Sequence, residues 1–221
     1  MLDTYCERAG NPGLWTEPLN LVTNLAFLIA AALAARRFVA APGLGLRNGW
    51  DLALLIVLLA AIGIGSALWH SVATGWAVLA DVIPIMLFIN VFLLSFGWRV
   101  LDLGVFGVIG LWVGYQAANY GLMVLVPVDA LNGSVGYLPP LAFLFGFWAV
   151  LRRRCHPMAG TMLVAAGLFT LSLTLRTVDK TLCPMLPIGT HFLWHLLNAV
   201  LLYVLLDVLI RKPDKSLRGE V

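Results

Sequence analysis

The sequence predicts an all-α membrane protein, a seven-transmembrane helix bundle with its N-terminus outside (periplasm or lumen) and its C-terminus in the cytoplasm. Of the 221 residues, 61% are hydrophobic and 11% are charged, whereas roughly 25% are charged in an ordinary soluble domain. A mean hydropathy of +0.94 is too apolar for one water-soluble core, because apolar atoms would also have to cover its surface. The apolar runs are continuous and lack the alternation of a lipid-facing strand, so helices are expected.

Seven runs are long enough to cross a bilayer, since a spanning helix needs roughly 20 apolar residues. In chain order they cover residues 20–38, 51–69, 80–98, 103–126, 135–151, 158–178 and 190–210. We interpret the chain as an extracytoplasmic segment, a membrane domain and a basic cytoplasmic tail, over residues 1–19, 20–210 and 211–221. The first run follows a polar, acidic stretch and not a basic one, so no removable signal peptide is expected.

The basic residues predict the orientation, because basic loops stay on the cytoplasmic side of a membrane. Of the 14 Lys and Arg residues, only Arg8, Arg176 and Lys180 fall in the N-terminal segment or near the second, fourth and sixth connections. The other eleven fall in the alternate set of segments: Arg36, Arg37, Arg47, Arg99, Arg152, Arg153, Arg154, Arg211, Lys212, Lys215 and Arg218. The net charge of +3 therefore reflects membrane topology, and a nucleic-acid partner is not expected.

Polar side chains inside spans are costly, so each is a candidate functional residue. The second span ends outside with Ser66 and His70, whose four-residue spacing puts both side chains on one helix face. The third span starts at the same depth with Asp81, and the seventh starts with His191 and His195, again four residues apart. We therefore expect three imidazoles, a carboxylate and a hydroxyl to meet near the outer face.

This combination suits a metal site, because catalytic zinc takes three protein ligands and a water, and two histidines at this spacing often supply two of them. Simpler interpretations stay open from the residues alone. Histidines facing a bundle interior often only pack and form hydrogen bonds. Asp81 could cap the third helix, and Ser66 could bond a backbone carbonyl. The fourth histidine, His156, lies beside the cytoplasmic arginines.

Together with the motifs around them, these residues make the chain resemble the alkaline ceramidase family of the CREST group of membrane hydrolases. Three motifs in the spans carry the resemblance: GSALWH at 65–70, Asp81 followed by IPIM at 83–86, and HFLWH at 191–195. The N-terminal segment and the approach to the last span add Cys6, Glu7, Trp15, Glu17, Pro18, NLVTN at 20–24, Asp179 and Cys183. The motifs occur in the family's order over nearly the whole chain.

The resemblance implies a zinc-dependent integral-membrane amidase that cleaves the amide bond of ceramide or a related N-acyl lipid, releasing a sphingoid base or amine and a fatty acid. The family's zinc ligands fall on His70, His191 and His195. Its catalytic serine and aspartate fall on Ser66 and Asp81. The expected partners are thus the lipid bilayer and a lipid substrate.

The family also has a calcium site in its N-terminal segment, which the chain matches less closely. Glu7 and Glu17 align, whereas Asp3 is out of register by one residue and Ala9 replaces a polar ligand, for which Asn11 is a substitute. Carboxylate oxygens are suitable Ca²⁺ ligands. Asp3, Glu7, Asn11 and Glu17 are therefore candidate calcium ligands, and the alternative is a solvated acidic terminus.

Amide hydrolysis needs a base, an oxyanion donor and an acid for the leaving amine. No glutamate lies between His191 and His195, so we expect Asp81 to take the proton of the attacking water and pass it to the amine. Ser66 is expected to donate a hydrogen bond to the oxyanion. Its alternative role is that of a covalent nucleophile.

The cysteines fit the predicted topology. Cys6 and Cys183 map to the outside, where an oxidising compartment permits a disulfide, and the resemblance supports the same pairing. Two free buried thiols are the alternative. Cys155 maps to the cytoplasmic arginine-rich connection and is expected to be free.

Two other function classes compete with an amidase. One is a receptor-like seven-helix zinc protein with little or no hydrolase activity, and the other is an ion or proton transporter. A transporter needs polar residues across the whole membrane, whereas the fourth and fifth spans have no ionisable residue through their centres. A bacterial inner membrane is favoured, because the tail has no obvious retrieval signal, and an endoplasmic reticulum or Golgi membrane is the alternative.

Overall fold

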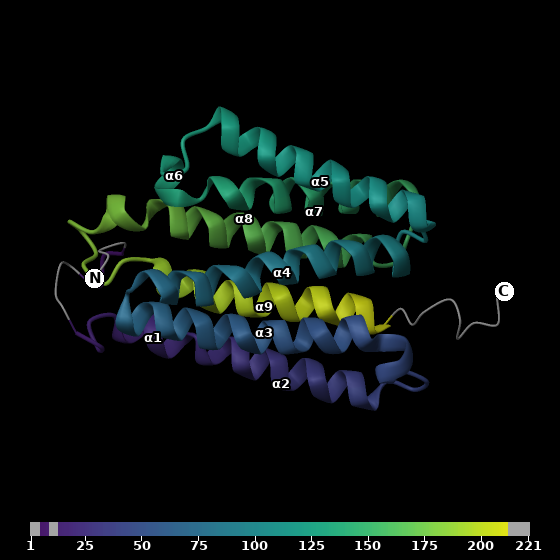
Figure 1. Ribbon diagram of the computed structural model, residues 1–221, viewed down its shortest axis with the longest axis horizontal. Helices are drawn as coiled ribbons and strands as arrows, with labels where there is room; N and C mark the ends of the chain where they lie inside the picture. The colour runs from purple at the N-terminus through teal and green to yellow at the C-terminus, as the bar shows by residue number, and fades with distance from the viewer. Residues whose placement is uncertain (1–4, 9–12, 212–221) are drawn as a thin grey trace.

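The computed structural model describes residues 5–8 and 13–211, and every regular element in this part of the chain is a helix. Seven helices are long and apolar enough to cross a membrane, which confirms the all-α, seven-helix fold. They comprise α1 with α2 (Pro18–Thr23, Leu25–Ala40), α3 (Leu46–Val72), α4 (Gly75–Arg99), α5 (Val105–Leu125), η1 with α7 (Val135–Tyr137, Leu138–Arg153), α8 (Ala159–Leu182) and α9 (His191–Arg211). The helices lie along one long axis (Figure 1). This architecture fits an integral multi-pass membrane protein.

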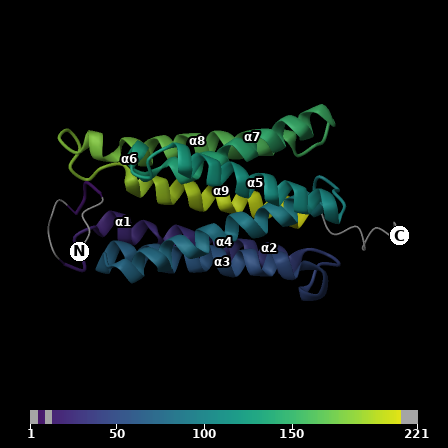
Figure 2. The same cartoon turned by 45° about the horizontal axis from the view of Figure 1, so that its top comes forward.

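Helix α9 lies in the middle of the bundle, between α2, α3 and α4 on one side and α7 and α8 on the other (Figures 1 and 2). Its buried side chains include Leu201, Leu205, Leu206 and Leu209, which fill the core on several faces. Helix α5 lies at the periphery and buries only Tyr115. The first residues of α9 are therefore placed in the interior, where they can form a site shielded from both water and lipid.

The helix boundaries differ from the predicted spans at two places that affect the site. The first span is divided at Asn24, whose N–H bonds the carbonyl of Leu21, three residues back, so α1 and α2 are separate segments. Helix α4 begins at Gly75, earlier than predicted. Asp81 thus lies inside a helix, and the interpretation of Asp81 as a helix cap is wrong.

The connection between α5 and α7 contains a short element that the sequence did not predict. Helix α6 (Ala130–Gly133) is a single turn, and Leu131 and Asn132 inside it have φ of 55° and 54°. Left-handed backbone is unfavourable for residues with a side chain. This distorted turn lies at the same end of the bundle as the start of α9 (Figure 1).

Two cross-links hold the ends of the bundle. At the histidine end, Cys6 and Cys183 form a disulfide with Cα atoms 5.3 Å apart, and Cys155 is exposed and free, which confirms both predictions. At the opposite end, buried Asp51 accepts hydrogen bonds from Arg99 at 2.6 and 2.8 Å, joining α3 to α4.

Candidate metal centre

Three of the four histidines meet where α3 ends and α9 begins. One ring nitrogen from each of His70, His191 and His195 lies within 4.8 Å of those of the other two. All three side chains are buried, with at most 3% of their surface exposed. The four-residue spacing on α9 places His191 and His195 one turn apart on the same face, toward His70 of α3, as the sequence predicted.

The start of α9 is fixed by Asp179 of α8. Its Oδ1 accepts hydrogen bonds from the backbone N–H groups of Thr190 and His191, at 2.6 and 3.0 Å. A carboxylate at this position satisfies N–H groups that no helical partner reaches and is favoured by the helix dipole. Gly189 has φ of +66°, and a Cβ there would collide with the Asp179 carboxylate. The local sequence therefore determines where His191 stands.

Two of the histidines are oriented by a second hydrogen bond. Nδ1 of His70 lies 2.5 Å from Oε2 of Glu17, and Nδ1 of His195 lies 2.9 Å from Oγ1 of Thr23. Metal-bound histidines usually engage their other ring nitrogen in this way, because the contact fixes the ring and the tautomer. The first span, through Glu17 and Thr23, thus directs both rings.

Two of the remaining ring nitrogens lack partners. Nε2 of His70 and Nδ1 of His191 are buried, and neither has a hydrogen-bond partner among the described residues. Burying an unpaired polar nitrogen is unfavourable. A metal ion held by imidazole nitrogens, for which zinc is well suited, would supply the missing contacts. The residues present therefore fit a metal ion.

Glu17 is held in its charged form by several donors. Besides His70, Arg8 donates to Oε1 at 2.5 Å and the Asn20 amide donates to Oε2 at 3.0 Å. Burial acts to raise the pKa of Glu17, but the hydrogen bonds from His70, Asn20 and Arg8 together bring it below the usual value. A charged carboxylate is the stronger acceptor for the His70 ring.

Tyr5 covers the outer side of the cluster. Its ring stacks on that of His191, with centroids 3.7 Å apart. Burial raises the pKa of Tyr5 to about 12, so its hydroxyl stays protonated and can donate. Because the disulfide of the neighbouring Cys6 ties this part of the chain to Cys183, residues 5–8 become a wall of the site.

A cavity of about 250 Å³ lies next to the histidines. Its lining includes His191, His195, Ser66 and Asp81, so the structure brings the predicted catalytic residues to the predicted ligands. The Ser66 hydroxyl lies within hydrogen-bonding reach of the Asp81 carboxylate. Residues from α3, α4 and α9 therefore share one polar space.

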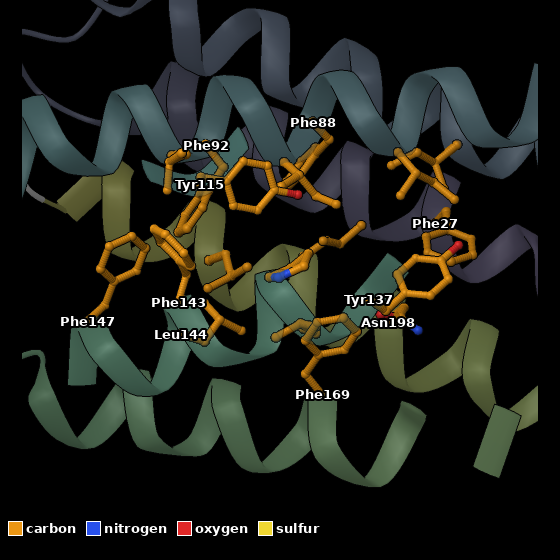
Figure 3. Close-up of a pocket in the computed structure, with 18 of the residues that line it drawn as sticks. Phe27, Phe88, Phe92, Tyr115, Tyr137, Phe143, Leu144, Phe147, Phe169 and Asn198 are labelled. Carbon is orange, nitrogen blue, oxygen red and sulfur yellow. The ribbon is translucent and has the colours of Figure 1, made fainter. Parts of the chain in front are cut away.

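An apolar cavity of about 80 Å³ continues from this space toward the other end of the bundle. The two cavities share lining residues, namely Phe27, Ile62, Ile85, Tyr137 and Trp194. Aromatic side chains of α4, α5, α7 and α8 point into the apolar cavity (Figure 3), and the polar groups of its lining side chains among the described residues are the Asn198 amide, two tyrosine hydroxyls and the Trp194 indole N–H. The combined shape suits a ligand with one polar end and one long apolar chain.

The predicted calcium ligands are described only in part. Asp3 and Asn11 lie outside the described residues. The Glu7 carboxylate accepts hydrogen bonds from the N–H groups of Leu19 and Asn20, at 2.7 and 2.8 Å, at the start of α1. Calcium binding in this segment stays a prediction.

Sequence reasoning did not anticipate the partners of the histidines. It considered Glu17 only as a calcium ligand and did not consider Thr23, which lies in the motif at 20–24. It also assigned no role to Arg176, which lines the metal cavity. The position of Arg176 inside a predicted span could have marked it as a candidate functional residue, because charged side chains are rare there.

The chain matches no protein-family model and no curated protein.

Proposed function

We propose that this protein is a zinc-dependent membrane amidase of the alkaline ceramidase type, which hydrolyses ceramide or a related N-acyl lipid. One observation carries the proposal. Three buried histidines, two of which have an unpaired ring nitrogen, converge beside Ser66 and Asp81, at the polar end of an apolar cavity. The motif order that resembles the alkaline ceramidases supports the same reaction.

His70, His191 and His195 would hold the zinc ion, with Glu17 and Thr23 orienting the first and last of them. Zinc bound by three protein ligands lowers the pKa of a water molecule to about 7 and polarises a carbonyl group. Calcium bound near Glu7 belongs to the same proposal and would tie the N-terminal segment to the start of α1, whereas both oxygens of Glu17 are already engaged by Arg8, His70 and Asn20.

The catalytic steps fall to Asp81 and Ser66. Asp81 takes the proton of the attacking water and returns it to the leaving amine, which avoids expelling an amide anion. Ser66, whose hydroxyl now faces Asp81, donates to the oxyanion that develops on the substrate carbonyl. The buried cluster excludes bulk water, which strengthens both contacts.

The apolar cavity supports a lipid substrate. It begins at Trp194, one residue before a zinc ligand, and reaches Leu205 on the same helix. The cavity thus runs along α9 away from the zinc ligands, which is where the apolar chain of a lipid would lie.

The proposal is tested by measuring metal content and lipid hydrolysis on the purified protein in detergent. We expect about one zinc ion per chain and release of fatty acid from ceramide. His191→Ala should lose both, whereas His156→Ala, which changes the histidine outside the cluster, should keep both. Zinc without turnover of any N-acyl lipid would favour a receptor-like protein. Absence of zinc would contradict the proposal and show that the three histidines only pack in the core.

A second test separates chemistry from metal binding. Asp81→Asn should abolish turnover and leave zinc content unchanged, because Asp81 is not a predicted ligand. Ser66→Ala should lower kcat by about 10²- to 10³-fold, the usual effect of removing one oxyanion donor. Full activity of Asp81→Asn would contradict its role as the base. Complete loss in Ser66→Ala, with an acyl-enzyme trapped on the wild type, would favour the covalent alternative.

A further inference from the structure

Arg176 is a charged side chain within a membrane-spanning helix, and the proposed reaction gives it no role. It lies on α8, three residues before Asp179, and lines the same cavity as Asp81 and His195. Ionisable groups at this depth are rare and mark ligand or ion sites, because an unpaired charge there is costly. Its contacts therefore bear on what the cavity binds.

The turn at α6 holds one side of the guanidinium. Nη1 of Arg176 donates to the carbonyl oxygen of Asn132 at 2.9 Å and to Oγ of Ser134 at 2.7 Å. Leu131 and Asn132 have φ of 55° and 54°, which is unfavourable for residues with side chains, and Gly133 follows with φ of 70°. Strain of this kind is concentrated at functional sites. The turn is thus shaped to present a carbonyl to Arg176.

Aromatic rings hold its faces. The guanidinium carbon lies 5.2 Å from the ring centroid of Tyr137 and 5.6 Å from that of Trp194. The Tyr5 hydroxyl is also within hydrogen-bonding reach. An arginine has five N–H donors, and the two on Nη1 are used by Asn132 and Ser134. Three donors, on Nη2 and Nε, remain, and with Tyr5 accepting from one of them two are left for an acceptor in the cavity.

Arg176, which is half-buried, differs from the buried arginines in having no direct ion pair among the described residues. Arg8 is paired with Glu17, and Arg99 is paired with Asp51. Within residues 5–8 and 13–211, no carboxylate lies within ion-pair distance of Arg176, although the Asp81 carboxylate, which lines the same cavity, attracts it over a longer distance. Charges shielded from water are ordinarily in direct ion pairs, so the guanidinium gives the cavity a positive group that a bound anion can pair with.

We propose that Arg176 binds the carboxylate of a lipid in the metal cavity, so that the ligand is an anionic acyl lipid. The planar guanidinium matches a carboxylate through two parallel hydrogen bonds. This inference rests on the proposed function for the position of the amide beside the histidines. The carboxylate has two sources, a headgroup next to the amide, as in an N-acyl amino acid, or the fatty acid that hydrolysis releases.

A binding experiment tests the proposal without requiring hydrolysis. Calorimetry on the purified protein should give an affinity for myristic acid about 10- to 100-fold higher than for myristyl alcohol, the range expected for a hydrogen bond to a charged group. Arg176→Gln should remove this preference, and Arg176→Lys should keep part of it. The control Arg152→Gln removes a cation that lies over the Trp148 ring outside both cavities and should change nothing. Equal affinity of the wild type for acid and alcohol would overturn the proposal.

Hydrolysis of N-myristoylglycine and of its methyl ester shows whether the carboxylate that Arg176 binds belongs to the substrate headgroup or to the released fatty acid. A headgroup site predicts that the wild type prefers the acid by about tenfold or more in kcat/KM, through KM, and that Arg176→Gln loses the preference. A product site predicts equal turnover of both, with myristate inhibiting the wild type more strongly than the variant. Selective binding of the acid with no turnover of any lipid would support Arg176 as the carboxylate site and overturn the amidase.

Discussion

At the scale of single residues, the orientation of His70 depends on a carboxylate from outside the bundle. Glu17 precedes the first helix, yet its side chain is buried and its Oε2 lies 2.5 Å from Nδ1 of His70. This contact assigns Nδ1 to the carboxylate and leaves Nε2 for a metal. The N-terminal segment is therefore part of the metal centre.

Replacing Glu17 tests this contact. Glu17→Gln keeps the size of the side chain but removes the charge that the His70 ring faces, so zinc affinity should fall by about 10- to 100-fold. Zinc affinity can be measured by competition with a chromogenic chelator. The control Glu7→Gln changes a carboxylate whose hydrogen bonds go to backbone N–H groups of α1, and it should bind zinc like the wild type. Equal losses in both variants would show a general effect of the segment and contradict the specific role.

The residues of the cluster could be predicted, but their supporting contacts could not. His70, His191 and His195 follow from helical spacing and from the depth at which each span starts, both of which are properties of the sequence. The contact of Glu17 with His70 depends on the path of the N-terminal segment, which no periodicity describes. Thr23 reaches His195 only because the first span breaks at Asn24.

At the scale of elements, the distance between α3 and α4 controls the position of Asp81. Gly65 lies directly before Ser66, and a Cβ there would collide with the carbonyl oxygen of Ala80 and lie 3.0 Å from the backbone nitrogen of Asp81. Backbones approach this closely only over a residue without a side chain, as in other membrane helix pairs. Glycine at 65 thus brings Asp81 to Ser66.

Gly65→Ala should separate α3 from α4 and move Asp81 away from the histidines. We expect the free energy of unfolding to fall by about 1–3 kcal/mol, the usual effect of overpacking, together with a loss of hydrolysis. The control Gly110→Ala is also a helical substitution, but its Cβ would meet nothing within 4 Å. Denaturation in detergent and lipid turnover, measured on both variants, separate the two effects. Unchanged stability and activity of Gly65→Ala would contradict the close approach.

The seven spans could be predicted because hydropathy reports burial in lipid directly. Their ends could not, since the residues from Gly75 to Ala80 suit a helix and a loop equally and the helical pairing with α3 decides between them. The distorted turn of α6 had no sequence signal either. Its left-handed residues are a leucine and an asparagine, and the contact with Arg176 is a tertiary one.

At the scale of the whole molecule, the two ends of the bundle differ in chemistry. The polar site, the disulfide and the distorted turn lie at one end, and Arg99 and the arginines at 152–154 lie at the other. A disulfide needs an oxidising compartment, and basic residues stay in the cytoplasm. Both rules predict that the metal site lies at the outer face.

Labelling of single cysteines tests this orientation. In right-side-out membrane vesicles, a membrane-impermeant maleimide should label Cys155 only after the vesicles are permeabilised, because its exposed thiol lies in the connection between α7 and α8. The control combines Cys155→Ser with Val128→Cys, which places a thiol at an exposed position between α5 and α6, at the histidine end. That thiol should react in intact vesicles. Since Cys6 and Cys183 are joined, neither contributes to the signal. The reverse pattern would place the metal site in the cytoplasm, where the disulfide would not persist and the substrate would have to come from the inner leaflet.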